Sequence, residues 1–268
     1  MVGRRNRGRH QLSELTRTQL DALPVKGGFR LRGMEMTRTE TFTDAAFAFA
    51  LTLLVISVDS IPANYEELLV AVQGIPAFGL SCMLLFLFWH GHWNWSRRYG
   101  LEDFPSMILS FFLVFVMLCY VYPMKFVTSS FVEWVSGQRI DANPETRPIG
   151  SIEEVFGMFT IYSIGFVALC IAVLLLYWRA WQCRDELDLS EVERFVTRSE
   201  LGSWTILTIV GGIAILLGLF APRSMVTMPG WAYMLLPVIM PAYGVYQGKR
   251  LARLLDEQTA GSPNRSQT

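Results

Sequence analysis

The chain contains six stretches of roughly 20 residues each that carry almost no charge, and this pattern constrains the fold more than any other feature. An α-helix of about 20 apolar residues crosses the ~30 Å hydrocarbon core of a bilayer. Lipid offers the backbone no hydrogen-bond partner, so each crossing stretch must be helical. The sequence therefore predicts an all-α integral membrane protein with six transmembrane helices, at residues 41–59, 68–93, 106–130, 154–178, 203–221 and 229–247.

Composition agrees with the membrane class, because 52% of the 268 residues are hydrophobic and only 17% are charged. Lys and Arg balance Asp and Glu at 23 each, so nothing indicates a nucleic-acid partner. Residues 1–37 are basic and lack the apolar core of a signal peptide, so we expect a cytoplasmic extension there. The transmembrane domain is then expected over 38–250 and a polar cytoplasmic tail over 251–268.

The distribution of Lys and Arg predicts the orientation in the membrane. Under the six-helix assignment, most of them lie before the first helix, after the last helix, or in the loops after the second and fourth helices. Cytoplasmic segments are enriched in Lys and Arg, so both termini are predicted to be cytoplasmic. The opposite side holds only Lys125, Arg139, Arg147 and Arg223.

The start of the first predicted helix is unusual, because Asp44 lies deeper than a terminal acid and needs a buried partner. At about 100° per residue, Asp44 is well separated from an apolar stripe that Thr52 alone interrupts. That stripe consists of Phe42, Ala45, Phe49, Thr52, Leu53 and Ile56. Alternatively, Glu40 and Asp44 are acids favoured at a helix N-terminus, and Phe49 packs against lipid or a neighbouring helix.

The second predicted helix ends at the same membrane depth as Asp44. His92 and Asn94 in its last turns could hydrogen-bond Asp44 or receive Arg38, which would build a polar cluster at the inner end of the bundle. The other interpretation is an interfacial aromatic belt of Trp89, Trp93 and Trp95 with satisfied histidines.

These residues resemble the transmembrane protein 175 family of potassium channels. Its signature Arg-x-x-x-Phe-Ser/Thr-Asp, with Thr eight residues after the Asp, is similar to Arg38 through Thr52. Trp89 and His92 match the family's Trp-x-x-His on the second helix, and Phe111 to Phe126 with Pro123 is similar to its third helix. The resemblance covers residues 38 to about 130 and is weak beyond them.

The resemblance implies a homotetrameric potassium channel without a re-entrant pore loop, lined by the first helix of each subunit. Carried over by position, Phe49 and Ile56 form the apolar constriction and Thr52 contributes to selectivity. Phe49 replaces the family's usual Ile or Leu, which could change the width of the gate. The residues that would hold the helices in place are Arg38, Phe42, Thr43, Asp44, Trp89 and His92.

Two other function classes stay open. One is a proton-coupled secondary transporter or proton pathway in which Asp44 and His92 titrate, and the other is a non-conducting scaffold or membrane-enzyme subunit. We expect no enzyme, because no nucleophile elbow, Walker loop or metalloprotease motif occurs. We expect no cofactor or metal either, since His90 and His92 point to opposite sides of their helix. The expected partners are membrane lipids, permeant monovalent cations and further copies of the chain, in the cytoplasmic membrane.

Overall fold

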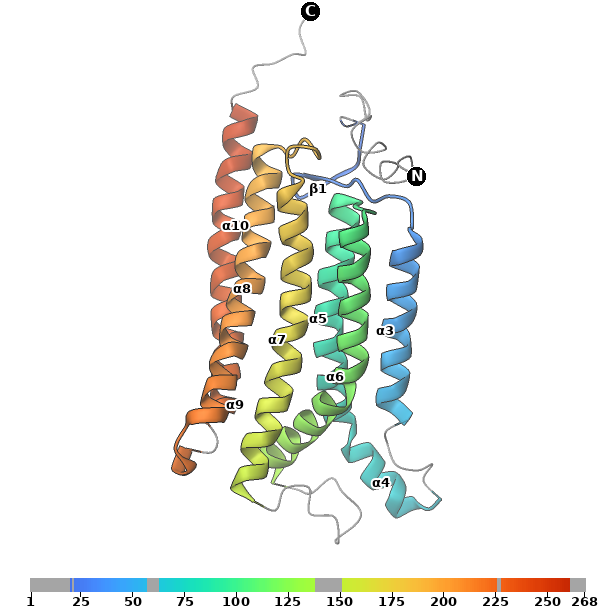
Figure 1. Ribbon diagram of the computed structural model, residues 1–268, viewed down its shortest axis with the longest axis vertical. Coiled ribbons are helices and arrows are strands. Elements are labelled where there is room, and N and C mark those ends of the chain that lie inside the picture. The colour runs from blue at the N-terminus through green and yellow to red at the C-terminus, as the bar shows by residue number, and fades with distance from the viewer. Residues whose placement is uncertain (1–19, 21, 57–62, 138–150, 226–227, 261–268) are drawn as a thin grey trace, which may run out of the picture.

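A computed structural model describes residue 20 and residues 22–56, 63–137, 151–225 and 228–260. Long helices lie side by side in a bundle, with a small hairpin at one end (Figure 1). The strands are β1 (Val25–Lys26) and β2 (Phe29–Arg30). The helices are α3 (Arg38–Ile56), α4 (Tyr65–Gln73), α5 (Ile75–Tyr99), α6 (Phe104–Ser136), α7 (Ile152–Gln182), α8 (Glu191–Phe220), the 3-10 helix η1 (Arg223–Met225), α9 (Met228–Met234) and α10 (Leu236–Ala260).

Four helical stretches within the described residues are long and apolar enough to cross a membrane: Tyr65–Tyr99, Phe104–Ser136, Ile152–Gln182 and Glu191–Phe220. Helix α3 is shorter and carries Arg38, Glu40 and Asp44. The chain is thus an all-α, multi-pass membrane protein, apart from its short hairpin. That α3 and α10 also cross the membrane remains a prediction.

Two of the predicted helices are divided by a break next to a proline. The helix expected over 68–93 forms α4 and α5, which are separated at Gly74, two residues before Pro76. The helix expected over 229–247 forms α9 and α10, which meet at Leu235, just before Pro237. Proline has no N–H to donate to the preceding turn, and its fixed φ suits the first turn of a helix, so a new helix tends to start there.

Other helices extend beyond their predicted ends. Helix α8 begins at Glu191 rather than 203, because Ser190 caps it in a reciprocal capping box with Glu193. Helix α10 continues to Ala260 rather than 247. Both extensions are polar or charged, so they continue the helix past the apolar window from which the prediction was made.

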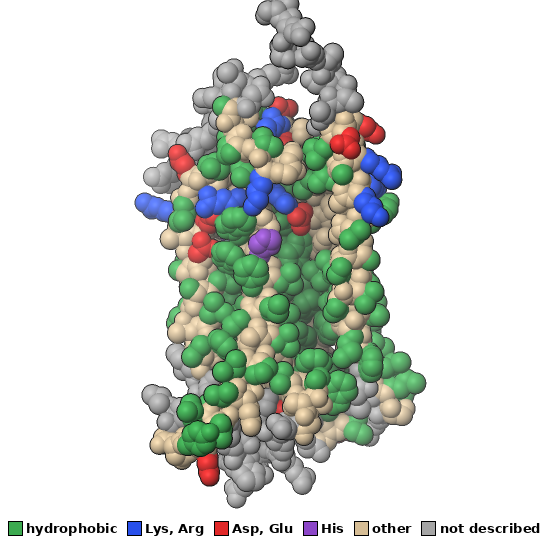
Figure 2. All heavy atoms as spheres, turned by 180° about the vertical axis from the view of Figure 1, so that it is seen from behind, with side chains coloured by type: hydrophobic (Ala, Val, Ile, Leu, Met, Phe, Trp, Pro, Cys, Tyr) green, Lys and Arg blue, Asp and Glu red, His purple; other side chains and the backbone are tan. Residues whose placement is uncertain are grey.

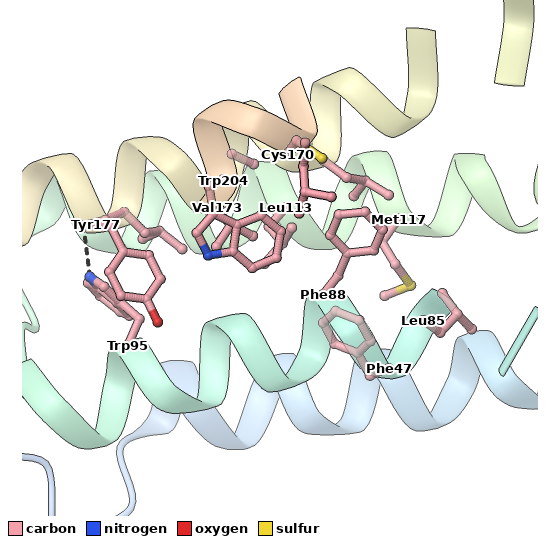
Figure 3. Packing of buried hydrophobic residues seen from close by; sticks show 14 of the residues in the cluster. Phe47, Leu85, Phe88, Trp95, Leu113, Met117, Cys170, Val173, Tyr177 and Trp204 are labelled. Carbon is pink, nitrogen blue, oxygen red and sulfur yellow. Dashed lines mark hydrogen bonds between the residues drawn. The ribbon is translucent and has the colours of Figure 1, made fainter. Parts of the chain in front are cut away.

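The core lies between α3, α5, α6, α7 and α8 (Figure 3). Phe47 from α3 and Phe88 from α5 face Leu113 and Met117 from α6, all nearly inaccessible to solvent. Trp204 from α8 packs beside Phe88, with ring centroids 6.0 Å apart. The contacts fix α3 against the rest of the bundle by shape, as expected where lipid gives no hydrophobic drive between helices.

Gly91 on α5 makes room for the ring of Trp204 from α8. A methyl group at that position would overlap the ring of Trp204. The neighbouring polar groups are satisfied between helices: the Trp95 indole nitrogen donates to the Leu176 carbonyl at 2.8 Å, and the Tyr177 hydroxyl donates to the Gly91 carbonyl at 3.3 Å. Helices α5, α7 and α8 are therefore locked together near this glycine.

The part of the N-terminal extension that is described is folded, which the sequence analysis did not predict. Strands β1 and β2 pair antiparallel, with Val25 opposite Arg30 and Lys26 opposite Phe29. Gly27 and Gly28 form the turn with positive φ angles of 59° and 79°, which glycine adopts without strain. The hairpin lies at the same end of the bundle as the start of α3 and the end of α10 (Figure 1).

Candidate functional site

Helix α3 presents two different faces, as its sequence predicts. The face that packs on α5 and α6 consists of Thr43, Phe47, Ala50 and Leu54, none more than 4% exposed. These positions are three or four residues apart and so form one stripe. The stripe fixes the rotation of α3 about its own axis.

The opposite face of α3 is largely exposed, although Phe42 at its edge stacks on Phe111 of α6. Phe42 is 51% exposed and Phe49 is 56% exposed, and Ala45 and Thr52 are exposed beside them. The Thr52 hydroxyl donates to the Ala48 carbonyl at 2.9 Å, which leaves its oxygen able to accept or to face a cation. The side chain of Ile56 lies outside the described residues.

Asp44 has a single hydrogen-bond partner among the described residues. The Trp89 indole nitrogen donates to its carboxylate at 2.8 Å, joining α3 to α5. Next to it, the buried Thr43 hydroxyl donates to the Thr39 carbonyl at 2.9 Å. Two members of the family signature thus meet across the helix pair at the depth that the sequence indicates.

His92 does not contact Asp44. It is 1% exposed, and its Nε2 lies 3.0 Å from the Ser110 hydroxyl of α6. Asn94 bonds instead to His90 on its own helix, and Arg38 is exposed and unpaired among the described residues. In place of one polar cluster around Asp44, the structure has two separate contacts. Asp44 with Trp89 joins α3 to α5, and His92 with Ser110 joins α5 to α6.

An ion pair that the sequence analysis missed lies one turn before Asp44. The Glu40 carboxylate is 2% exposed, and the Arg97 Nε from the end of α5 approaches it to 3.2 Å. Glu40 has the spacing of a capping residue, since its backbone N–H donates to the Thr37 hydroxyl at 3.0 Å. Because its place at the helix start already explains Glu40, the sequence did not indicate its ion pair with Arg97.

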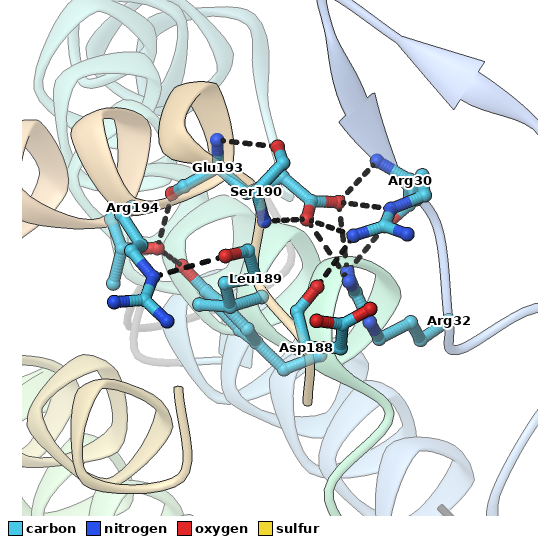
Figure 4. A network of polar contacts seen from close by, with 9 residues as sticks. Arg30, Arg32, Asp188, Leu189, Ser190, Glu193 and Arg194 are labelled. Carbon is cyan, nitrogen blue, oxygen red and sulfur yellow. Dashed lines mark hydrogen bonds and ion pairs between the residues drawn. The ribbon is translucent and has the colours of Figure 1, made fainter. Parts of the chain in front are cut away.

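Residues 22–37, which we call the strap, connect α8 to the start of α3. The fully buried Glu193 carboxylate accepts hydrogen bonds from Arg30 and from both terminal nitrogens of Arg32, the latter at 3.0 Å (Figure 4). Phe29 is 2% exposed and meets Tyr99 edge-on, with centroids 5.4 Å apart. The strap is therefore a packed part of the molecule.

The strap also clasps the end of α5. The Gly33 N–H donates to the Arg97 carbonyl at 3.1 Å, and the Arg97 guanidinium donates back to the carbonyls of Gly33 and Met34, each at 3.1 Å. A side chain at Gly33 would overlap the backbone of Ser96. Arg97 consequently joins the strap, α5 and the first turn of α3.

No group of three or more His, Cys, Asp or Glu residues in the described part of the chain could hold a metal ion. Cys82, Cys119, Cys170 and Cys183 are not joined in disulfides. The arrangement around α3 is that of a helix with one anchored face and one open, largely apolar face.

Comparison with known proteins links this arrangement to one family. Residues 38–123 match the family model described as endosomal/lysosomal potassium channel TMEM175. A protein of Marivirga tractuosa named potassium channel is 32% identical over 235 residues, covering 85% of this chain and 94% of that protein. A crystal structure of a variant of the potassium channel MtTMEM175, in complex with a nanobody–MBP fusion, superposes with a TM-score of 0.72 at 29% identity, covering 85% of this chain and all of that one.

Proposed function

Because the chain belongs to the TMEM175 family of potassium channels, we propose that it conducts potassium ions through a pore that α3 of several identical subunits surrounds. The observation that carries the proposal is the open face of α3. Phe42, Ala45, Phe49 and Thr52 are exposed while the opposite stripe of the same helix is anchored. In a homotetramer, four such faces would enclose a common axis.

Phe49 and Ile56 form the apolar constriction in this proposal. A ring of four phenyl groups at one level excludes water when the helices are close and admits it when they part, as hydrophobic gates do. Thr52 lies between these two levels, and its hydroxyl oxygen is positioned to replace part of the hydration shell of a cation. Potassium loses its hydration shell more easily than sodium, so this position would contribute to selectivity.

The polar contacts behind α3 would keep that helix in place. Trp89 bonds Asp44 in the second turn of α3, and Arg97 pairs with Glu40 one turn nearer the strap. His92 and Ser110 hold α5 to α6. Arg38, Phe42 and Thr43 complete the family signature at this end, where Phe42 stacks on Phe111 with ring centroids 6.4 Å apart.

We further propose six crossing helices, in which α3 and α9–α10 join the four longer spans, with both termini in the cytoplasm of a bacterial cell membrane. Basic side chains form a belt at the strap end of the bundle, above a surface that is mostly apolar (Figure 2). Cytoplasmic loops are enriched in Lys and Arg, so the strap end would face the cytoplasm.

Reconstitution in liposomes tests the proposal. Potassium, sodium and proton fluxes are compared for the parent chain, Phe49→Ala and Thr52→Ala. We expect Phe49→Ala to raise potassium flux severalfold and Thr52→Ala to lower the potassium-to-sodium ratio. Phe220→Ala is the control, because Phe220 is also an exposed phenylalanine, 78% against 56% for Phe49, and lies at the end of α8, away from α3. Unchanged flux and selectivity in both α3 variants would refute the assigned pore lining.

The proton-coupled alternative predicts a different outcome. It requires Asp44 and His92 to exchange protons, whereas Asp44 bonds Trp89 and His92 bonds Ser110. With the channel, Asp44→Asn keeps the acceptor for Trp89, lowers the yield of assembled protein and leaves the ion preference unchanged. Abolished transport with normal assembly, together with pH-coupled uptake in the parent chain, would favour the transporter.

A further inference from the structure

Two arginines on the outer surface of α8 and α10 carry uncompensated charge. Arg198 and Arg250 are both exposed, and neither forms an ion pair within the described residues. Their neighbours differ: Arg98 pairs with Glu200 at 2.6 Å, and Arg194 pairs with Asp185 at 2.8 Å. Positive charge without an ion-pair partner among the described residues therefore lies at Arg198 and Arg250, next to arginines that are paired.

Both guanidinium groups lie over aromatic rings, within the distance of a cation–π contact. The central carbon of Arg198 lies 4.7 Å from the ring centroid of Trp181 on α7. That of Arg250 lies 5.5 Å from Phe195 and 5.8 Å from Tyr246. Stacking fixes the plane of a guanidinium while its N–H edge stays free to donate, which suits bidentate binding of a phosphate.

The α8–α10 contact links the positions of the two arginines, because Arg250 of α10 lies over Phe195 of α8. Phe195, under Arg250, is three residues before Arg198 and so lies on the same face of α8. The Tyr243 hydroxyl of α10 donates to the Ser199 carbonyl of α8 at 3.2 Å, which holds the two helices together at this level. Lys249 and Arg253 add exposed positive charge on α10.

The surface next to these arginines is apolar, and this determines the kind of anion. Trp178 is 50% exposed, Val245 is 60% exposed and Tyr246 is 58% exposed. In Figure 2 the basic belt borders a mainly apolar surface, as at a membrane interface. A soluble phosphate would use only the cations, whereas a phospholipid would also lay its acyl chains along the apolar side chains.

We propose that Arg198 and Arg250, stacked on Trp181, Phe195 and Tyr246, bind the headgroup phosphate of an anionic phospholipid of the cytoplasmic leaflet. Basic pockets between transmembrane helices on the cytoplasmic side are suited to such headgroups. The site lies on the opposite edge of the bundle from α3 (Figure 1), so a tetramer around α3 would leave it facing lipid. It is thus separate from the proposed pore.

Native mass spectrometry of the full chain in detergent tests the site by counting bound phosphatidylglycerol against phosphatidylcholine. The variant is Arg198→Gln with Arg250→Gln, and the matched control is Arg194→Gln, which removes a paired arginine from the same helix. Each neutralised arginine should weaken phosphatidylglycerol binding about fivefold, and the double variant about 25-fold. Arg198→Lys, which keeps the charge and loses the planar guanidinium, should bind phosphatidylglycerol with an affinity between those of the parent chain and Arg198→Gln.

Binding of phosphatidylcholine reports folding and should be unchanged in every variant. Glycerol phosphate, which has the headgroup without acyl chains, should bind far more weakly than phosphatidylglycerol. The site is refuted if the double variant keeps the parent's preference for phosphatidylglycerol, or if Arg194→Gln loses as much of it. Equal binding of glycerol phosphate would refute the lipid and identify a soluble phosphate site. These readouts do not depend on ion flux, so they remain valid whatever the pore conducts.

Discussion

Replacing Glu193 by Gln should release the strap from the end of the bundle. The Glu193 carboxylate is fully buried and faces Arg32, whose side chain is 1% exposed, and Arg30, whose side chain is 18% exposed. Gln keeps an oxygen for the Ser190 N–H, which donates to Glu193 at 2.8 Å, so the cap of α8 survives. The substitution therefore removes the charge and one acceptor oxygen while it keeps the cap.

The size of the effect follows from burial. Removing one partner of a buried ion pair leaves the other charge uncompensated, which costs roughly 3–5 kcal/mol. Arg30 can turn toward solvent and Arg32 cannot, so Arg32 carries most of that cost. Because the amide still accepts one hydrogen bond, we expect about 3 kcal/mol, the lower end of this range.

Hydrogen exchange of the backbone measures this free energy where it acts. The Leu31 N–H donates to the Pro24 carbonyl at 2.9 Å, and the Gly33 N–H donates to the Arg97 carbonyl at 3.1 Å, so both amides report whether the strap is docked. A cost of about 3 kcal/mol corresponds to a loss of protection of about 150-fold, since 1.4 kcal/mol is a factor of ten. Amides in the middle of α7 should exchange as in the parent chain, because detachment is local.

Arg194→Gln is the control for the Glu193 variant. Arg194 follows Glu193 on α8 and forms an ion pair with Asp185, which precedes that helix. The substitution breaks this pair, but the side chains of Arg194 and Asp185 are 41% and 66% exposed. Exposed pairs contribute about 0–1 kcal/mol, so protection of the strap should change by less than about fivefold. Equal loss of protection in both variants would refute the reasoning, because burial would then not decide the cost.

Two further substitutions test the packing that positions α3. Gly91→Val should destabilise the bundle by about 1–3 kcal/mol, since the added side chain would overlap Trp204. The melting temperature in detergent measures this loss, and Gly212→Ala, at an open position on α8, is the control. Trp89→Phe removes the hydrogen-bond donor to Asp44 and should lower the stability by about 1–3 kcal/mol, because the carboxylate is left without its partner. Asp44→Asn in the Trp89→Phe background should recover part of this stability, and no recovery would count against the bond.

The membrane class and the family were predicted correctly from the sequence. Both depend on local signals, namely uncharged runs long enough to cross a bilayer and the spacing from Arg38 to Thr52. The two faces of α3 were also predictable, because helical periodicity determines which residues share a stripe. The ends of the helices were less predictable, because α8 begins before and α10 continues beyond the apolar stretch that hydropathy identifies.

The depth of Asp44 in the membrane limited its possible partners to a few residues of α5, but it did not determine which of them Asp44 bonds. Trp89, His92 and Asn94 all lie in the last turns of α5, and which of them faces α3 depends on the rotation of one helix against another. His92 turns to Ser110 instead, because α6 packs on that side. The sequence thus identified the elements that meet without determining the pairing.

The strap was beyond prediction for a different reason. Arg30 and Glu193 are separated by 163 residues, and the capping-box spacing of Ser190 and Glu193 gives no sign of the distant partner. The two glycines of the turn were a local hairpin signal, but the paired segments have only two residues each and gain their stability from Phe29 and the buried ion pair. Structure that depends on such distant contacts leaves no periodic signal in the sequence.

The open face of α3 and its anchored face have different energetic requirements, and this bears on how subunits would assemble. In lipid, the exposed Phe42 and Phe49 gain little from burial, because acyl chains are as apolar as a neighbouring helix. Thr52 already bonds its own helix, so no unsatisfied donor forces association. Assembly around α3 would therefore depend on close packing of complementary surfaces. The contacts behind α3 then matter twice, since Trp89, Arg97 and the strap hold the helix at the rotation that such packing requires.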